Sequence, residues 1–285
     1  MKMYRQIIRD LSQVYPDGEA QALARWLFEE CFGLNQTDIL LDKDNDLSAD
    51  DIVKLQEFVR RLLCHEPIQY ILGHTTFCGH RFITAPGALI PRPETEQLVR
   101  HILEHPMTAG FSGSLLDIGT GTGCIALSLA LALPKVSVTA WDVSPAALDV
   151  AQRNADMYPE AKVVIEKADV LSPPADERLW DIIVSNPPYV RQCEAADMEH
   201  NVLDYEPHLA LFVSDTDPLL FYRAIAEYAS AHLRNGGQLW FEINQYLGME
   251  TAHLIEEYGF TDVSIINDSY GNPRFLSSIK TALSL

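Results

Sequence analysis

The chain has 285 residues, 47% of them hydrophobic, and a formal net charge of −19. This length suits one sizeable α/β domain with a small accessory domain, and the excess of acids disfavours a protein that holds DNA or folded RNA through many phosphate contacts. The five cysteines form no C-x-x-C pair, which argues against a disulfide framework or a zinc ribbon. No apolar run approaches the length of a membrane span and no signal peptide is evident, so we expect a cytoplasmic protein.

The first 73 residues follow a helical pattern. Apolar residues recur at helical spacing and predict helices at 4–15, 18–32 and 48–64. Ser48 is suited to cap the last of these helices, because its hydroxyl can accept a backbone N–H of the first turn. We expect a small N-terminal helical-bundle domain over residues 1–73, with its aromatic residues in the bundle core.

Residues 74–89 form a predicted linker between this bundle and the rest of the chain. Two short runs on either side of Cys78-Gly79 predict the strands of a hairpin, at 75–77 and 80–85. Prolines then stiffen the chain before a helix that begins near Glu94.

A glycine-rich turn follows a strand predicted at 115–118. It consists of Gly119, Thr120, Gly121, Thr122 and Gly123. An apolar helix at 124–133 follows, so the backbone can approach a ligand closely and the helix N-terminus favours an anionic group. An NAD-binding fingerprint would have a third glycine at position 124, where this chain has Cys124, and this difference argues against NAD.

Three further strands are predicted at 136–142, 163–169 and 181–185. The first two end in acids, Asp142 and Asp169. Asp142 stands roughly 20 residues after the first glycine of the turn, the position from which a carboxylate grips a ribose diol. The third strand delivers the next motif to the same carboxyl edge of the sheet, where ligands bind in open α/β folds.

That motif is Asn186, Pro187, Pro188 and Tyr189, and it suits a planar NH₂ group. The Asn186 side-chain carbonyl and the carbonyl between the two prolines can accept both N–H groups, and the locked proline φ angles fix the second acceptor. Tyr189 can stack on the flat group. Alone, the motif suits a proline-rich turn at a strand end equally well. The glycine-rich turn upstream favours the interpretation of this motif as a binding site for a planar NH₂ group.

The C-terminal third continues the alternation of helices and strands. Its predicted elements are a helix at 218–233, a turn at 235–237, a strand at 238–243, a helix through Tyr258, and two closing strands at 261–267 and 274–281. Glu242 and Asp268 stand at strand ends. Acids in such places are more often solvated than catalytic, so we expect both to be exposed.

One metal motif is set aside. His101-Ile102-Leu103-Glu104-His105 matches a pattern of some zinc peptidases. Pro106 ends the helix at once and no third ligand is evident downstream, and a histidine in a last helical turn is favourable without any metal. We therefore expect no metal.

Together these motifs resemble the class I S-adenosylmethionine-dependent methyltransferases, and among them the release-factor glutamine methyltransferases, the HemK or PrmC family. The resemblance rests on residues 87–96, which include Ile-Pro-Arg-Pro-Glu-Thr-Glu, on 117–123 and on 186–189, and it covers nearly the whole chain. It implies an α/β fold, a Rossmann-like seven-stranded methyltransferase sheet over residues 90–285 whose last two strands form an antiparallel addition.

The resemblance also implies an activity, the transfer of a methyl group from S-adenosylmethionine to the side-chain amide nitrogen (N5) of glutamine in the Gly-Gly-Gln motif of bacterial peptide chain release factors. Asn186, Pro187 and Tyr189 would be catalytic and, with Pro188, would bind the glutamine. The cofactor would lie on the turn from Gly119 to Gly123, with its ribose on Asp142, its adenine amino group on Asp169 and Asn186 close by. Val170 stands where some relatives have an aromatic residue against the adenine, so the sequence does not determine which residues would pack on the adenine ring.

The implied partner is a release factor, docked by the N-terminal domain on a face that the sequence does not select. We expect a monomer that binds neither nucleic acid nor membrane. Arg92 and Glu94 either help to shape the pocket or form a surface ion pair in a rigid linker. Alternative functions are methylation of an exocyclic amine of DNA or RNA, a non-catalytic cofactor-binding scaffold, and an NAD-dependent dehydrogenase, which the glycine spacing disfavours.

Overall fold

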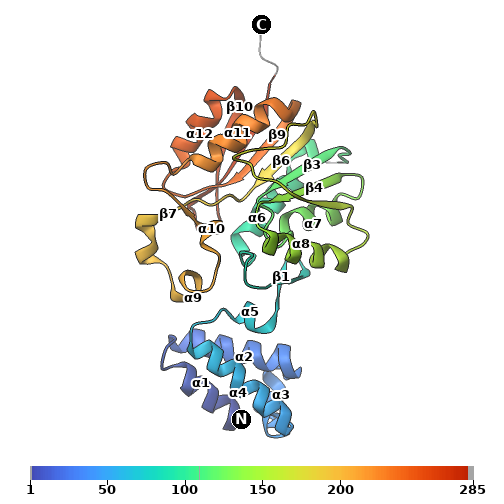
Figure 1. Ribbon diagram of the computed structural model, residues 1–285. Coiled ribbons are helices and arrows are strands. Elements are labelled where there is room, and N and C mark those ends of the chain that lie inside the picture. Colours follow the sequence, from blue (N-terminus) through green and yellow to red (C-terminus); the bar gives the residue numbers. More distant parts are fainter. Residues whose placement is uncertain (1, 109, 282–285) are drawn as a thin grey trace. The chain divides into compact units, whose positions relative to one another are not determined.

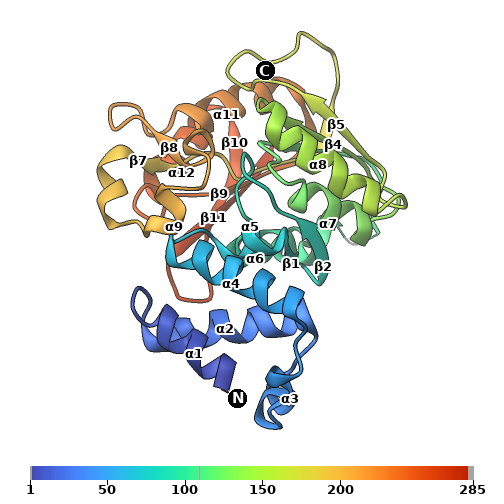
Figure 2. The same cartoon turned by 60° about the horizontal axis from the view of Figure 1, so that its bottom comes forward.

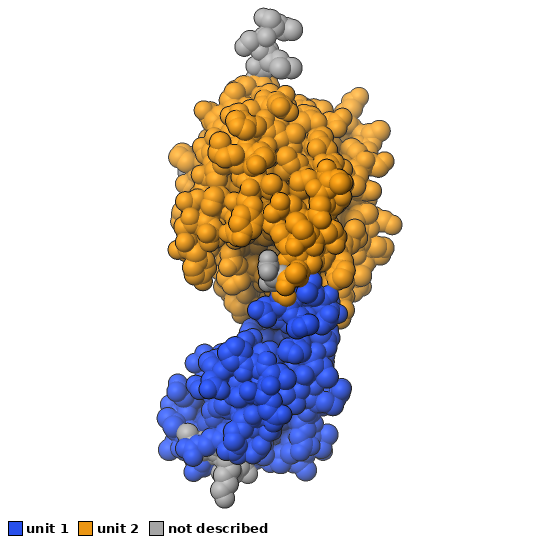
Figure 3. Space-filling model, turned by 90° about the vertical axis from the view of Figure 1, so that its left-hand side faces the viewer, with its two compact units in different colours: residues 1–74, 199–205 blue, residues 75–198, 206–285 orange. Residues whose placement is uncertain are grey.

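The computed structural model describes residues 2–108 and 110–281. Internal contacts divide the chain into two compact units (Figure 3). The first unit comprises residues 1–74 and 199–205, and the second comprises 75–198 and 206–285. The predicted domain boundaries after residues 73 and 89 stay a prediction. No pattern in the sequence indicated that residues 199–205 belong with the N-terminal helices.

The first unit is helical (Figure 1). Its helices are α1 (Lys2–Leu11), α2 (Asp17–Phe32), α3 (Gln36–Leu40), α4 (Ala49–Leu63), α5 (Ile68–Leu72) and α9 (His200–Leu203), with a 3₁₀ turn η1 (Lys43–Asn45). The three long helices were predicted, although the first ends at Leu11 and not at Tyr15. The five-residue helices α3 and α5 are too short for a periodic pattern, and the sequence analysis missed them.

Local rules account for the ends of these helices. Ser48 accepts the backbone N–H of Asp51 at 3.1 Å, and the Asp51 carboxylate accepts that of Ser48, which forms the capping box that starts α4. Buried apolar side chains of α1, α2 and α4, among them Leu11, Leu27 and Leu55, form the hydrophobic core of this unit. Tyr205 joins the returning segment to this unit by donating its hydroxyl to the Cys64 carbonyl at 2.6 Å.

The second unit is built on a seven-stranded sheet, which confirms the predicted fold class. Its strands are β3 (Ser114–Ile118), β4 (Ser137–Asp142), β5 (Val163–Lys167), β6 (Trp180–Ser185), β9 (Leu233–Glu242), β10 (Phe260–Asn267) and β11 (Pro273–Lys280). The spatial order is β10-β11-β9-β6-β3-β4-β5. β11 pairs antiparallel with both neighbours, and the other neighbouring strands pair parallel. The last strand is thus inserted between β9 and β10.

Helices cover both faces of this sheet (Figure 1). One face carries α6 (Pro93–Glu104), α7 (Cys124–Ala132) and α8 (Pro145–Met157), and the other carries α11 (Leu220–His232) and α12 (Gly248–Glu257). Leu115 packs on the first face and Leu116 on the second, as the two-residue period of a strand requires. With both faces buried, the central strands read as continuous apolar runs.

Short elements complete the second unit. They are β1 (His74–Phe77), β2 (His80–Ile83), η2 (Pro106–Thr108), β7 (Val190–Arg191), η3 (Gln192–Asp197), α10 (His208–Leu211) and β8 (Phe212–Val213). The predicted hairpin is β1 with β2, which lies near α6 and α7 (Figure 2). Its Phe77 and Phe82 pack into one core cluster with residues of those two helices.

The turn predicted at 235–237 is wrong, because these residues lie within β9. The pairing of β9 with β6 shifts register between Trp180 and Ile182, so the glycines form an irregularity inside the strand and do not precede it. Gly237 is required there. A Cβ at this position would lie 2.8 Å from the Arg234 carbonyl oxygen and 3.0 Å from that of Asp181.

Gly237→Ala should therefore lower the free energy of unfolding by about 1–3 kcal/mol, since the blocking atoms belong to the backbone and cannot turn aside. Gly248→Ala in the same unit is the matched control, because its Cβ would make only ordinary contacts at 3.5 Å or more. Urea unfolding of both variants measures the difference. Equal stabilities would contradict the steric account.

Candidate active site

The glycine-rich turn lies between the end of β3 and the start of α7. Gly119, Gly121 and Gly123 have φ of +74°, +57° and +81°, a region that favours glycine. The N–H groups of Gly119 and Thr120 both donate to the Trp141 carbonyl at 2.9 Å, which fixes the turn on β4. A Cβ on Gly121 would meet no atom within 4 Å, so this side of the turn faces open space.

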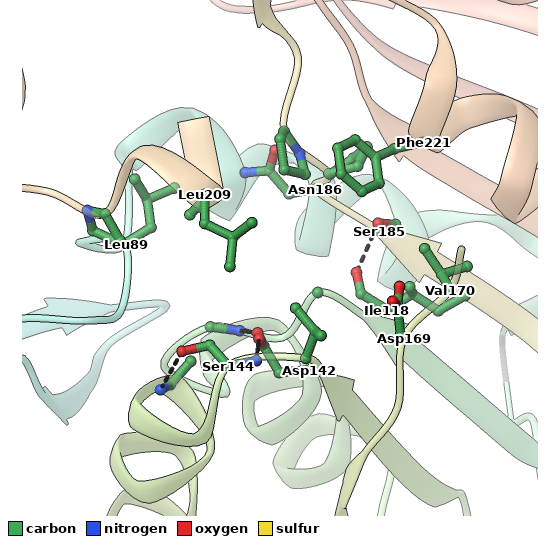
Figure 4. Close-up of a pocket in the computed structure, with 18 of the residues that line it drawn as sticks. Leu89, Ile118, Asp142, Ser144, Asp169, Val170, Ser185, Asn186, Leu209 and Phe221 are labelled. Atoms are coloured by element: carbon green, nitrogen blue, oxygen red, sulfur yellow. Dashed lines mark hydrogen bonds between the residues drawn. The ribbon is translucent and has the colours of Figure 1, made fainter. Parts of the chain in front are cut away.

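That space is a cavity of about 250 Å³ at the carboxyl ends of the parallel strands. Figure 4 shows Asn186 and Phe221 on one side of it and Asp142 and Ser144 on the other. The predicted site residues that line the cavity are Gly119, Gly121, Asp142, Asp169, Asn186, Pro187 and Pro188. These residues lie close together because they follow β6, β3, β4 and β5, which are consecutive strands of the sheet.

Four predicted residues do not line the cavity. The Thr120 hydroxyl donates to Asp117 at 2.6 Å, and the Thr122 carbonyl accepts from Asn154 at 2.9 Å. Gly123 begins α7. The ring of Tyr189 packs against the core on the α11 side of the sheet, and its hydroxyl donates to Glu242. These residues support the glycine-rich turn and the loop of Asn186 without lining the cavity.

Asp142 is held in place by the turn that it faces. One carboxylate oxygen accepts the N–H of Gly121 and the other that of Ser144, each at 2.9 Å. Burial raises the pKa of the Asp142 carboxyl above its usual value, while these backbone N–H groups act in the opposite direction. Each carboxylate oxygen keeps a lone pair for a further donor. Asp169 is exposed and accepts the Leu171 N–H at 2.9 Å.

Asn186 belongs to a chain of buried hydrogen bonds that the sequence did not reveal. Its side-chain N–H donates to the Thr95 hydroxyl at 3.3 Å, and Thr95 donates to the Glu242 carboxylate at 2.7 Å. Tyr189 donates to the second carboxylate oxygen at 3.0 Å. The expectation that Glu242 and Asp268 are solvated is wrong, because only 2% and 6% of their surfaces are exposed. Each acid has hydrogen-bond donors that offset burial, which the sequence pattern could not show.

Arg92 does not pair with Glu94. It forms an ion pair with Glu206, whose side chain is buried and which also accepts the Ile90 N–H at 3.0 Å. Leu89, close to Arg92 in the sequence, and Pro207, next to Glu206, both line the cavity. The sequence analysis missed Glu206, because its partners are 114 and 116 residues away along the chain.

The donor set of the cavity fits S-adenosylmethionine. Asp142 offers carboxylate oxygens to a ribose diol, and Ile118, Val170 and Phe221 supply apolar walls for a base. The open face of Gly121 leaves room for a ligand next to the backbone. Val170 is buried and still lines the cavity, so the cavity wall is aliphatic at this position.

No group of three or more His, Cys, Asp or Glu side chains among the described residues is placed to hold a metal. In the motif that resembles a zinc peptidase, the His101 ring packs on Phe275 and the His105 ring on Trp240, with ring centroids 5.5 and 5.6 Å apart. Across the part of the chain that the structure describes, no helix has the length and apolar character needed to cross a membrane.

Comparisons with known proteins show the family of this chain. A family model for the PrmC N-terminal domain matches residues 2–73, and one for the methyltransferase small domain matches residues 93–205. The release factor glutamine methyltransferase of Bacteroides thetaiotaomicron is 46% identical over 95% of this chain and 97% of its own. That of Flavobacterium psychrophilum is 45% identical over 97% and 98%. The chain belongs to the release factor glutamine methyltransferase family.

Solved structures support the fold alone. The 16S rRNA N2 G1207 methyltransferase of T. thermophilus, solved with AdoMet and guanosine, matches with a TM-score of 0.54 at 21% identity. The match covers 73% of this chain and 49% of that one. The methyltransferase fold of this family member is thus found in an enzyme whose target is RNA.

Asp117, beneath the glycine-rich turn, gives this site a pH-dependent stability. The side chain is fully buried, and burial raises the pKa of its carboxyl from 3.8 to about 7. A raised pKa means that the folded state holds a proton that the unfolded chain releases. The stabilisation is thus complete below about pH 4 and is lost as the pH rises through about 7.

Asp117→Asn should remove this dependence, because the amide does not titrate. The stability of the wild type relative to the variant should fall by a few kcal/mol, on the order of 4, between about pH 4 and pH 7.5. Urea unfolding followed by tryptophan fluorescence at several pH values measures it. A difference that does not change with pH would contradict the buried-carboxyl account.

Proposed function

We propose that the chain transfers a methyl group from S-adenosylmethionine to the N5 side-chain nitrogen of the glutamine in the Gly-Gly-Gln motif of peptide chain release factors. One observation carries the proposal. Asn186 and Pro187 line the same cavity as Asp142 and the glycine-rich turn, in a member of the release factor glutamine methyltransferase family. An acceptor for a planar NH₂ group thus lies beside a fitting cofactor site.

The cofactor would be held at the carboxyl edge of the sheet. The turn from Gly119 to Gly123 would hold its methionine end, Asp142 its ribose hydroxyls and Asp169 its adenine amino group. In this role Gly119 and Gly121, which line the cavity, would contact the ligand, while Thr120, Thr122 and Gly123 would shape the turn. The bound cofactor supplies an electrophilic methyl group on a positively charged sulfur, so no nucleophilic side chain is needed.

The residues of the chain position the acceptor. Asn186 and the Pro187 carbonyl would accept the two N–H groups of the glutamine amide and aim its nitrogen lone pair at the methyl carbon, with Pro188 beside them. The sulfur would keep the electron pair of the broken C–S bond and leave as a neutral thioether, and the methylated amide nitrogen would release its extra proton to water. These residues therefore only need to hold and orient the amide, and no strong base is required before transfer. Because Tyr189 donates to Glu242 and does not line the cavity, we assign it a positioning role in place of stacking.

Other functions fit less well. Methylation of an exocyclic amine of DNA or RNA uses similar acceptors, but a net charge of −19 offers few groups for phosphates. A non-catalytic scaffold would have no use for an Asn186 amide at the cofactor cavity. We further propose that the chain works as a cytoplasmic monomer and that the first unit docks the release factor.

Asp142→Ala should weaken S-adenosylmethionine binding by roughly 10-fold to 100-fold, the value of a hydrogen bond to a carboxylate. Calorimetry measures the affinity, and circular dichroism verifies the fold. An unchanged affinity would remove Asp142 from the cofactor site. NADH binding as tight as that of the methyl donor would overturn the cofactor assignment.

Asn186→Ala should lower turnover by about 10²-fold or more, because one preorganised acceptor at the reacting nitrogen is lost. Cofactor affinity should change less. The assay uses an intact release factor and labelled S-adenosylmethionine, and mass spectrometry should find one added methyl group on the glutamine of Gly-Gly-Gln. Wild-type protein that modifies DNA or RNA but not this glutamine would sink the function, and full activity of Asn186→Ala would sink the mechanism.

A further inference from the structure

Thr95 lies between the amide of Asn186 and a buried carboxylate. Its oxygen is 3.3 Å from the Asn186 side-chain nitrogen and 2.7 Å from a Glu242 carboxylate oxygen. Thr95 and Glu242 are only 3% and 2% exposed. Neither residue lines the cavity, whereas Asn186 does. Any effect of the pair on a substrate must therefore pass through Asn186.

Counting protons fixes the direction of this chain. A hydroxyl has one proton, and an ionised carboxylate can only accept, so the Thr95 proton points to Glu242. The Thr95 oxygen can then only accept a hydrogen bond from Asn186. The NH₂ end of the Asn186 amide must face Thr95, and its carbonyl oxygen must face away. The two ends of an amide are nearly equal in shape, and this hydrogen-bond polarity distinguishes them.

Three groups beside Glu242 stabilise the ionised form of its carboxyl against the effect of burial. Thr95 donates to one carboxylate oxygen and Tyr189 to the other, so a carboxyl proton would meet a donor on either side. Burial, the largest effect, raises the pKa of the Glu242 carboxyl, and the negative charge of Glu94 acts in the same direction. The hydrogen bonds from Thr95 and Tyr189 and the positive charge of Arg274 on β11 act to lower it. Tyr222 on α11 donates to the main-chain carbonyl of Glu242 at 3.1 Å and leaves the carboxylate free for its two donors.

We infer that Thr95 and Glu242 are positioning residues that set the polarity of Asn186, so that a carbonyl oxygen and not an NH₂ group meets the substrate. The inference rests on the proposed function, because a substrate that presents N–H groups needs acceptors at this place. A reversed Asn186 would bring N–H against N–H. The chain Glu242, Thr95, Asn186 therefore selects an amide or amine donor group as the substrate and excludes an acceptor group.

Two substitutions of Thr95 separate polarity from packing. Thr95→Val keeps the shape and loses the hydroxyl, whereas Thr95→Ser keeps the hydroxyl and loses a methyl group. Polarity predicts that Val lowers kcat about 10-fold or more, with the KM for the release factor and the affinity for S-adenosylmethionine within about twofold of wild type, and that Ser stays close to wild type. A packing role predicts the opposite order.

Glu242→Gln is the second test. Glutamine offers one acceptor and one NH₂ group, so one of its two hydroxyl partners must turn round. Arg274 hydrogen-bonds to the Tyr189 hydroxyl, so Tyr189 needs the glutamine oxygen as acceptor for its own proton, and the NH₂ group is expected to face Thr95. The Thr95 proton then turns to Asn186 and the amide reverses. We expect kcat to fall at least as far as in Thr95→Val, again with little change in cofactor affinity.

The outcomes are distinct. Wild-type protein that leaves the release factor glutamine unmodified would end the proposed function. An active wild type together with Thr95→Val at full kcat, or with Thr95→Ser slower than Thr95→Val, would overturn only the polarity inference. Wild-type kcat in Glu242→Gln would do the same. Cofactor affinity serves as the measure of folding in each variant, so a misfolded Thr95→Val leaves the decision to Glu242→Gln.

Discussion

Glu242 has only 2% of its surface exposed, so its carboxylate needs hydrogen-bond donors from the protein. These hydrogen bonds connect the elements of the second unit that surround the site. The donors come from different elements, since Thr95 lies in α6 and Tyr189 follows β6, while Glu242 itself ends β9. These elements are far apart in the sequence. Because the carboxylate joins them, the loop that carries Asn186 has a defined place at the carboxyl edge of the sheet.

The sequence predicted those parts of the fold and site that short-range patterns encode. The turn from Gly119 to Gly123 needs residues tolerant of positive φ, and the alternation of apolar strands and helices predicted the layers. Asp142 and Asn186 were placed together because the carboxyl ends of parallel strands share one edge. For these residues, local chemistry and topology determine position.

What the sequence could not provide depends on contacts between distant residues. Glu206 is held by Arg92 from 114 positions away, and Asp117 beneath the turn becomes buried only when the sheet forms. The same limit explains the error about Glu242, since an acid at a strand end is solvated unless donors from elsewhere reach it. The stacking expected of Tyr189 stays a prediction, and the sequence could not show that its hydroxyl donates to Glu242, 53 residues away.

The Arg92 and Glu206 pair shows how a site built from distant segments keeps its shape. Leu89 and Pro207 both line the cavity, and each lies close in sequence to one member of this pair. Because the Glu206 side chain is buried, the loss of Arg92 would leave a charge without its ionic partner at the wall of the cavity, where solvent cannot compensate fully. The cavity therefore has two kinds of support. The strand edge sets the positions of Asp142 and Asn186, and the ion pair joins the two segments that contribute Leu89 and Pro207 to the cavity wall.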